Sequence, residues 1–585
     1  MSALTHPTPR RELSILIVQM GGIEEVFRSL MALKAVKHLY PEVQLHFIAR
    51  KEASAPLKRV DWLASVIETP ACSSDEDSVA KVALWIDQII HPHYDLLVNW
   101  TFSDRFARMA AIATSLIPAL VKLGDYARED LTIASFDAWS MYRRSWLKNG
   151  ISQDIHHTDI ITTQLLTALQ IHAGDPNPDS GYSAVTSRYF FKNAPAEIPG
   201  EWANRAKNLK WSAIHAASVG ERGQEWIETV LRRHPDAGVV ILGEHECDWE
   251  IEVNPRVINL SGALHFDSLI LVLSQCSWLL SGPNAIVDLA SLINLRVLYA
   301  VSAAEHPDSL GWTESGPYGN GHLVVVSEFK PEIAYAVWSY VQSEWFHKGS
   351  LSLADHFENL SLSSALAEAR IYRSRIRPAQ EGGGVCFERS DVKTSESPTL
   401  ESWMYRVRGQ LARAWFCGWL PGVEAEVAKM GMNPSLIKRV REITESLSVL
   451  DRLSLEGSAV AKELHATAAA LKNQRLMSVE DRAVIEEYGK KLLEIETLMD
   501  RVIQVEPELR ALTEWYRQLM HNLNGETISQ MAKETVHAFE LVNEGVELMS
   551  LYARKTLELA KPKAVQPDAG AHLTAIGPEG SPPRY

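Results

Sequence analysis

The first fifty residues combine two hydrophobic periods. Residues 15–18 form a short apolar run with branched side chains, which predicts a strand buried on both faces of a parallel sheet. The glycine pair at 21–22 then permits a tight turn. Apolar residues recur at helical spacing over 26–36, and a second strand is predicted over 43–49. This strand–helix–strand unit opens its first turn at the carboxyl end of a strand, where open α/β sheets bind their ligands.

Strand and helix patterns continue to alternate further along the chain. Residues 94–100 predict another buried strand, and a helix is expected over 105–116. A stretch rich in Pro, Gly, Asn and Ser at 174–199 marks a connection, after which the alternation resumes. The expected strands there are 211–217, 238–243, 256–260, 277–281 and 295–301, and the expected helices are 224–233, 266–275 and 284–293. Such alternation predicts a second parallel sheet.

The pattern changes beyond residue 400, where only helical periodicity remains. Helices are expected over 433–453, 458–471, 479–503, 508–520 and 526–559. Gly457 separates the first pair, and a break at 522–525 precedes the last helix. Antiparallel helices joined by short turns are the simplest arrangement.

Composition and charge narrow the class of protein. The chain has 585 residues and a net charge of -15, which argues against broad nucleic-acid binding. Its five cysteines are widely spaced and show no paired metal pattern, and they fit a reducing compartment. The N-terminus has no apolar signal region, and the sequence has no run of about 18 apolar residues. These features predict a cytoplasmic protein.

The segment from residue 14 to 50, SILIVQMGGIEEVFRSLMALKAVKHLYPEVQLHFIAR, resembles the N-terminal signature of glycosyltransferase family 9, the lipopolysaccharide heptosyltransferases. Members typically read I-L-I-V-R-x-x-x-x-G-D-V, then a helix ending before Tyr-Pro. The hydrophobic pattern, the length and the pair Tyr40-Pro41 match, whereas Glu24-Glu25 replaces the family's Gly-Asp. The GPYG sequence at 316–319 is also common in this family. The resemblance covers roughly residues 13 to 345.

The resemblance implies a GT-B fold: two Rossmann-like domains with the active site between them, here followed by an all-α helical module. We expect an acceptor domain over 1–185, a linker over 186–210, a nucleotide-sugar domain over 211–375 and a second linker over 376–400. A helical bundle or coiled-coil module over 401–561 and a disordered tail over 562–585 complete the prediction.

The family aspartate acts as general base, so the resemblance implies that Glu25 takes this role by position. Both glutamates are alternatively first-turn carboxylates that stabilise the helix N-terminus. The further acceptor-side residues that the resemblance implies are Gly21, Gly22, Glu24, Asn99, Thr101 and Ser103. For the last three, helix capping by Ser103 or Asp104 is an equally weighted alternative to hydrogen bonds with a sugar.

The donor side is implied by three turns of the second domain. The predicted donor-binding residues are Ser218, Gly220, Arg222, Gly243, Glu244, Gly282, Asn284 and Asp288. A turn at a helix N-terminus offers N–H groups to a diphosphate, although a plain capping turn with a solvated arginine explains 218–222 equally well. The family motif D-[ST]-G-x-x-H-x-A departs here, since its Asp, Gly and His fall on Pro283, Ala285 and Asp288.

Two other sequence features have a functional and a plain interpretation. The pair His156-His157 suggests a metal, but adjacent side chains diverge and no third ligand follows at a useful spacing, so we expect a polar pair at a helix start and no metal site. Residues 403–420 combine three tryptophans with three arginines. They predict either contact with the inner face of the membrane or a bundle helix with buried tryptophans.

Two hypotheses of function follow. The first is an inverting glycosyltransferase, which transfers a heptose-like sugar from a nucleotide-diphospho sugar such as ADP-heptose to a glycan or protein acceptor and needs no further cofactor. In this family such chemistry serves lipopolysaccharide biosynthesis. The second is a catalytically inactive GT-B scaffold that binds a protein partner through residues 401–561. Glu24-Glu25 and the altered donor motif favour the second, and the two-domain pattern favours the first.

Overall fold

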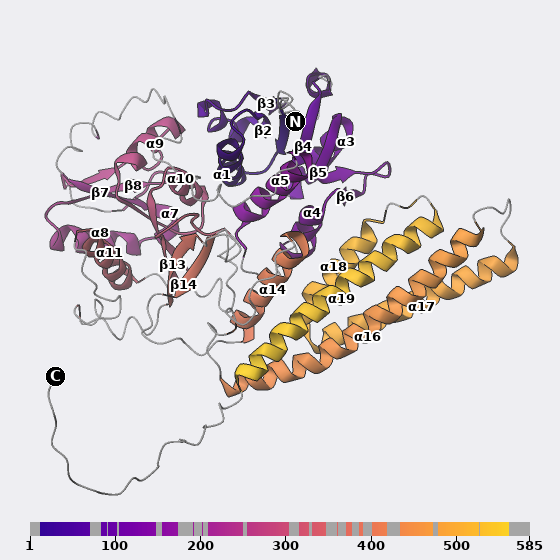
Figure 1. Cartoon of the computed structure of the whole chain (residues 1–585). Coiled ribbons are helices and arrows are strands. Elements are labelled where there is room, and N and C mark those ends of the chain that lie inside the picture. The colour runs from indigo at the N-terminus through magenta and orange to yellow at the C-terminus, as the bar shows by residue number, and fades with distance from the viewer. Residues whose placement is uncertain are drawn as a thin grey trace, which may run out of the picture.

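The computed structural model contains two α/β lobes and a long helical bundle (Figure 1). It describes residues 12–70, 84–90, 92–101, 104–147, 155–173, 191, 202, 209–249, 254–302, 315–326, 330–346, 360, 370–376, 385–389, 400–417, 427, 433–471, 478–523, 525 and 527–560. The predicted tail 562–585, most of the linker 186–210 and Ser103 lie outside these residues. No helix among the described residues is long and apolar enough to cross a membrane.

The first lobe is a six-stranded sheet in the order β3-β2-β1-β4-β5-β6. Its strands are β1 (Ser14–Gln19), β2 (Gln44–Arg50), β3 (Ser65–Thr69), β4 (Tyr94–Asn99), β5 (Ala119–Ala127) and β6 (Ile133–Ser135). All pairs are parallel except β5 with β6. The helices are α1 (Ile23–Leu39), α3 (Asp104–Leu116), α4 (Ala138–Tyr142) and α5 (His157–Ala173), with the π-helical turn η3 (Arg143–Leu147) and the short 3-10 turns η1 (Lys51–Ala53) and η2 (Leu57–Arg59). The expected βαβ start of the chain is confirmed.

The second lobe is an eight-stranded sheet in the order β14-β13-β12-β11-β10-β7-β8-β9. Its strands are β7 (Lys210–His215), β8 (Ala237–Leu242), β9 (Val257–Asn259), β10 (Trp278–Ser281), β11 (Arg296–Val301), β12 (Leu323–Val326), β13 (Arg370–Ile376) and β14 (Val385–Arg389). Its helices are α7 (Ala216–Val219), α8 (Arg222–Arg233), α9 (Phe266–Gln275), α10 (Ala285–Leu292) and α11 (Pro331–Phe346). Two Rossmann-like lobes are therefore present, as a GT-B fold requires.

The predicted linker over 376–400 is wrong in part, because it contains β14. This strand pairs antiparallel with β13, which in turn pairs antiparallel with β12. Val385 is buried at 2% exposure and Phe387 packs against the core of the lobes. Cys386, between these two residues, is also buried at 8% exposure, so both faces of the first part of β14 are covered. Glycines and charges on either side hide this short pattern in the sequence.

The bundle consists of α14 (Leu400–Cys417), α16 (Pro434–Leu471), α17 (Val479–Val505), α18 (Arg510–His521) and α19 (Ile528–Leu559), with the 3-10 turn η8 (Pro507–Leu509) before α18. Helix α16 runs for 38 residues without the expected break at Gly457. A β-carbon at Gly457 would collide with the ring of Phe539, so this glycine serves close packing of α16 on α19. The packing partner lies far along the chain, and the local pattern does not reveal it.

The bundle is not the separate module that the sequence predicts. Its apolar core includes Trp139, Tyr142 and Trp146 of the first lobe, together with Trp515 and Tyr516 of α18. The indole nitrogen of Trp146 donates a hydrogen bond of 3.1 Å to the carbonyl of Ala511. Figure 1 shows α18 beside α4. Bundle and first lobe therefore share one continuous core.

The side-chain amide of Asn522 hydrogen-bonds the free edge of β6, the last strand of the first sheet. Ser135 of β6 donates its backbone N–H to Oδ1 of Asn522, and Nδ2 of Asn522 donates to the carbonyl of Ser135, both at 3.3 Å. Arg128 adds hydrogen bonds to the carbonyls of His521 and Leu523. The turn after α18 thus covers the edge of the sheet.

In the tryptophan-rich helix α14 the first tryptophan, Trp403, is buried, as the bundle-helix interpretation predicts. Trp403 and Val407 are fully buried, and Trp403 Nε1 donates to Thr556 Oγ1 at 3.0 Å. These contacts place α14 against α19 inside the bundle. The side chains of Trp415 and Trp419 lie outside those that the structure describes.

Candidate functional site

Each sheet has one point where the strand order reverses, and open α/β sheets bind ligands at such points. In the first sheet β1 lies between β2 and β4, and in the second β7 lies between β8 and β10. Glu24 and Glu25 lie in the first turn of α1 after β1, Ser218 lies on α7 after β7, and Asn284 lies in the turn after β10. Each switch point thus lies beside one of the predicted groups of site residues.

The carboxylates of Glu24 and Glu25 fold back over the glycine turn at the start of α1. A β-carbon at Gly21 would collide with the Glu25 carboxylate, and one at Gly22 would collide with that of Glu24. Gly22 is the N-cap of α1 and has no side chain with which to cap the helix. The two glycines therefore make room for acidic groups at the positive end of the helix. Both glutamates are half-buried.

The floor of this turn is built from buried polar side chains. Gln19, which is 2% exposed, accepts a hydrogen bond from Gly21 N–H at 2.9 Å through Oε1 and donates to the Trp100 carbonyl at 2.9 Å through Nε2. Arg143 donates to the same carbonyl at 3.0 Å through Nη2. Burial lowers the pKa of Arg143, and the carboxylates of Asp125 and Glu25 oppose this shift. A buried cation thus lies close to the glutamate turn.

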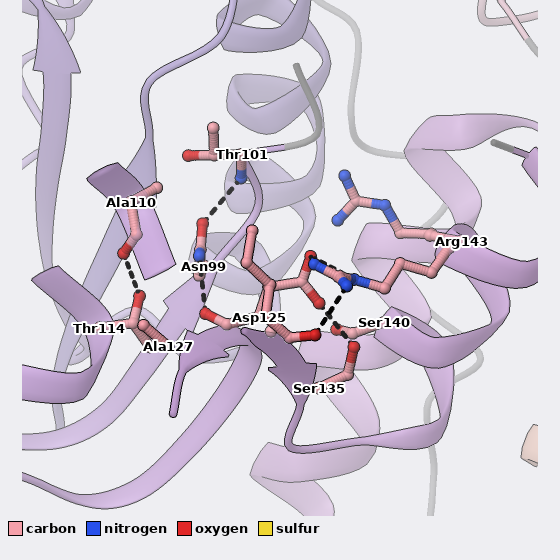
Figure 2. A network of polar contacts seen from close by, with 12 residues as sticks. Asn99, Thr101, Ala110, Thr114, Asp125, Ala127, Ser135, Ser140 and Arg143 are labelled. Atoms are coloured by element: carbon pink, nitrogen blue, oxygen red, sulfur yellow. Dashed lines mark hydrogen bonds and ion pairs between the residues drawn. The ribbon is translucent and has the colours of Figure 1, made fainter. Parts of the chain in front are cut away.

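Asn99 and Thr101, for which the sequence predicts either a sugar contact or helix capping, hydrogen-bond the ends of neighbouring strands. Asn99 Nδ2 donates to the Asp125 carbonyl at 2.8 Å, and its Oδ1 accepts from Thr101 N–H at 2.9 Å (Figure 2). Thr101 Oγ1 accepts from Met20 N–H at 2.8 Å. Both side chains are at most 3% exposed and have protein partners. Their polar atoms are used by the ends of β1, β4 and β5, which the local pattern does not show.

The histidine pair lies at the start of α5 as expected. The Nδ1 atom of His156 accepts from Thr158 N–H at 3.1 Å, so Nε2 carries the proton and donates to the Gly316 carbonyl at 2.9 Å. Burial lowers the pKa of His156 to about 3. Burial, and then the positive charges of Arg143 and Arg28, lower the pKa of His157 well below its ordinary value. His156 therefore joins the lobes as a neutral imidazole.

In the second lobe, four side chains meet at the ends of β7 and β10. Asn284 caps α10, since its Oδ1 accepts from Ile286 N–H at 2.9 Å. Its Nδ2 therefore faces Ser218 Oγ at 2.7 Å, Ser281 Oγ at 2.8 Å and His215 Nδ1 at 3.0 Å. Nδ2 has two hydrogens for these three partners, and His215 Nδ1 also lies 2.7 Å from Ser218 Oγ. Burial lowers the pKa of His215, and the charge of Glu244 opposes the shift.

The other residues that the sequence predicts on the donor side follow β7, β8 and β10 in the chain. Gly282 packs its Cα side against Ser218 and the Ala300 carbonyl, which leaves little room for a side chain. Gly220 has a φ of 61°, a conformation that favours glycine, and it ends α7. Arg222 begins α8 and is exposed, and Glu244 is exposed just after Gly243. The sequence predicts site roles for Ser218, Gly282 and Asn284, but it gives none to His215 and Ser281.

Asp288, which the sequence predicts on the donor side, has its carboxylate bound by a protein cation. Its carboxylate lies on α10 and accepts two hydrogen bonds from Arg28 of α1, at 3.2 Å from Nε and 3.0 Å from Nη2. The Asp288 side chain is 1% exposed. Burial raises its pKa to about 6, against the pull of the Arg28 charge. The sequence gives no sign of this pair, because the partners are 260 residues apart.

Comparisons with known proteins find likeness only among solved structures. No protein-family model and no curated protein matches the chain. The E. coli heptosyltransferase WaaC with ADP has 13% identity and a TM-score of 0.41, and the match covers 57% of this chain and 99% of that one. A family 9 glycosyl transferase from Veillonella parvula has 12% identity and a TM-score of 0.39, over 60% and 96%. E. coli ADP-heptose lps heptosyltransferase II has 12% identity and a TM-score of 0.37, over 57% and 99%.

Proposed function

We propose that this chain is an inverting glycosyltransferase that uses a nucleotide-diphospho sugar. The observation that carries the proposal is the pairing of two switch points across the lobes. One presents the carboxylate of Glu25, and the other presents the cluster around Asn284. Helices α1 and α10, which begin at these turns, pack on each other between the lobes (Figure 1). The resemblance of residues 13–345 to family 9 supports the same reaction class.

The chemistry assigns one role to each lobe. Glu25 takes the proton of an acceptor hydroxyl while the acceptor oxygen bonds to the anomeric carbon of the donor. The bond between that carbon and the diphosphate oxygen breaks, and the nucleoside diphosphate leaves with its electron pair. The polar turns at 218–222 and 282–284, with Arg222, meet the negative charge that develops on the leaving group. A heptose-like sugar and a glycan or protein acceptor follow from the resemblance.

Donor binding is tested by calorimetry of the full chain with a panel of ADP-, GDP- and UDP-sugars. We expect one nucleotide class to bind and Arg222→Ala to weaken it by about 1.5–3 kcal/mol, the value of a hydrogen bond to a charged group. Arg232→Ala, at the exposed far end of α8, is the matched control and should bind like the wild type. If no nucleotide sugar binds, the chain is the inactive scaffold.

Transfer is tested with the donor found in this way. Glu25→Gln keeps the shape of the side chain and removes the base, so we expect transfer to fall by roughly 10²–10⁴-fold while donor affinity stays unchanged. Glu24→Gln is the matched control on the same turn, and it should retain most of the activity. Full activity of Glu25→Gln would exclude Glu25 as the base.

A further inference from the structure

We propose that the ion pair of Arg28 with Asp288 is a positioning device that sets the register of the two lobes for transfer. The inference rests on the proposed function. The pair joins α1 of one lobe to α10 of the other through two hydrogen bonds of 3.0 and 3.2 Å. Its side chains are 14% and 1% exposed. Each residue follows a candidate site residue on its own helix by about one turn.

The position of the pair relates the two candidate sites directly. Arg28 lies one turn after Glu25, and Asp288 lies one turn after Asn284. At about 1.5 Å of rise per residue, the backbone of each residue lies about 4.5–6 Å along its helix from that of the corresponding site residue. A fixed Arg28–Asp288 distance therefore fixes the approach of Glu25 to the donor turn. A displacement of about 1 Å between reacting groups can cost about 10²-fold in rate.

The chemistry of the pair indicates that it orients the two helices and adds little to the free energy of unfolding. A buried ion pair often contributes little net stability, because taking both charges out of water offsets their attraction. A guanidinium that binds both oxygens of one carboxylate nevertheless fixes their relative orientation. Glu24 of the same turn also acts on Asp288, which shows that the first turn of α1 lies near α10. The pair thus specifies one alignment of α1 and α10. Apolar contacts alone are not directional and do not specify a single alignment.

The chain offers a matched control in a second bond between the lobes. Arg59 of η2 binds both carboxylate oxygens of Asp267 on α9. Its side chains are 33% and 24% exposed, and neither residue adjoins a candidate site residue. The same substitutions in this second pair therefore change the contact between the lobes without changing the register of Glu25 and Asn284.

The test compares Arg28→Met/Asp288→Leu with Arg59→Met/Asp267→Leu in the full chain. Both variants replace a pair of charges with apolar groups, and the melting temperature checks that they fold. Arg28→Lys keeps the positive charge but cannot donate the paired hydrogen bonds of a guanidinium. It serves as the test variant if the first double variant does not fold. We measure amide hydrogen exchange in α1 and α10, donor affinity by calorimetry, and the turnover number with the donor found above.

We expect Arg28→Met/Asp288→Leu to exchange amides of α10 at least tenfold faster than the wild type. Its turnover number should fall tenfold to a hundredfold, while its donor affinity stays within twofold of the wild-type value. The turnover number of Arg28→Lys should lie between those of the wild type and the double variant. The control should match the wild type in α10 exchange and turnover. Equal exchange and turnover in both double variants would overturn the inference. A wild type that transfers no sugar would refute the proposed function, and the exchange result would still decide whether the pair sets the register.

Discussion

The hydroxyl of Tyr318 donates a hydrogen bond of 2.7 Å to Oδ1 of Asp159, and so ties the second lobe to the first turn of α5. The other oxygen of Asp159 accepts from Val385 N–H at 2.8 Å. Tyr318 is 1% exposed, and it belongs to the GPYG sequence. One carboxylate of the first lobe therefore holds both a loop and the strand β14 of the second.

Tyr318→Phe should lower the free energy of unfolding by about 2 kcal/mol, because a buried hydrogen bond to a charged group contributes about 1.5–3 kcal/mol. Urea unfolding followed by tryptophan fluorescence measures the change. Tyr335→Phe is the control, since the Tyr335 hydroxyl bonds the neutral ring of His234 at 3.1 Å. A loss for Tyr318→Phe no larger than for the control would contradict the assignment.

His156 should make the protein less stable in acid. Its pKa in the fold is lowered to about 3 by burial, below the ordinary value of 6.5. The unfolded chain therefore binds a proton that the folded chain refuses, so stability is complete above pH 6.5 and falls as the pH drops toward 3. At pH 5 the loss from this group is about 2 kcal/mol.

The measurement is the urea midpoint of the wild type and of His156→Gln at pH 7.5 and pH 5. The variant cannot titrate at this position, so its midpoint should fall less over that range. His38→Gln, at the exposed end of α1, should follow the wild type. Parallel curves for His156→Gln and the wild type would show that His156 does not govern this part of the pH dependence.

Gly457→Ala should destabilise the bundle by about 1–3 kcal/mol, the usual cost of overpacking a core. The added methyl group would collide with Phe539, whose buried ring packs against Tyr516 at a centroid distance of 4.7 Å. Gly489→Ala is the matched control on α17, where a methyl group meets no atom within 4 Å. There the better helix propensity of alanine should stabilise by about 0.5–1 kcal/mol. Thermal unfolding followed by circular dichroism distinguishes the two signs.

Deletion of residues 400–585 should leave a two-lobe fragment that associates with itself. The deletion uncovers Trp139, Tyr142 and Trp146, which are at most 5% exposed in the whole chain. Exposed aromatic surface of this kind promotes association. Light scattering and dye binding measure the outcome, and coexpression of the fragment 400–560 should restore a soluble complex. A monomeric 1–399 fragment with cooperative unfolding would support the independent module that the sequence predicts.

The sequence predicts those parts of the fold that depend on neighbouring residues. The apolar run 15–18 and the helical spacing of 26–36 identify β1 and α1, because burial on a sheet follows a local period. Glycine turns at strand ends also locate Asn284 and Ser218. Gly457 misleads, because a glycine in a helix signals a break unless the distant ring that needs its space is known.

The candidate site is only partly predictable for the same reason. Asp288 carries no local sign that Arg28 neutralises it, and Asn99 carries none that Asp125 accepts its amide proton. Arg143 and Gln19 both donate hydrogen bonds to the carbonyl of Trp100, close to the glutamate turn, and these three residues are far apart in the chain. Such contacts depend on the order of the strands in the sheet and on the packing of the helices against it. The spacing of residues along the sequence specifies neither.

The double hydrogen bond between Asn522 and Ser135 has a consequence for self-association. An amide side chain offers one donor and one acceptor, as a peptide group does, so Asn522 occupies the place that a neighbouring strand would take beside β6. Sheets with an open border tend to recruit foreign strands and to polymerise. In this protein a single residue at a helix junction fills that border, and fibre formation at this end of the sheet is blocked for as long as α18 and α19 stay docked.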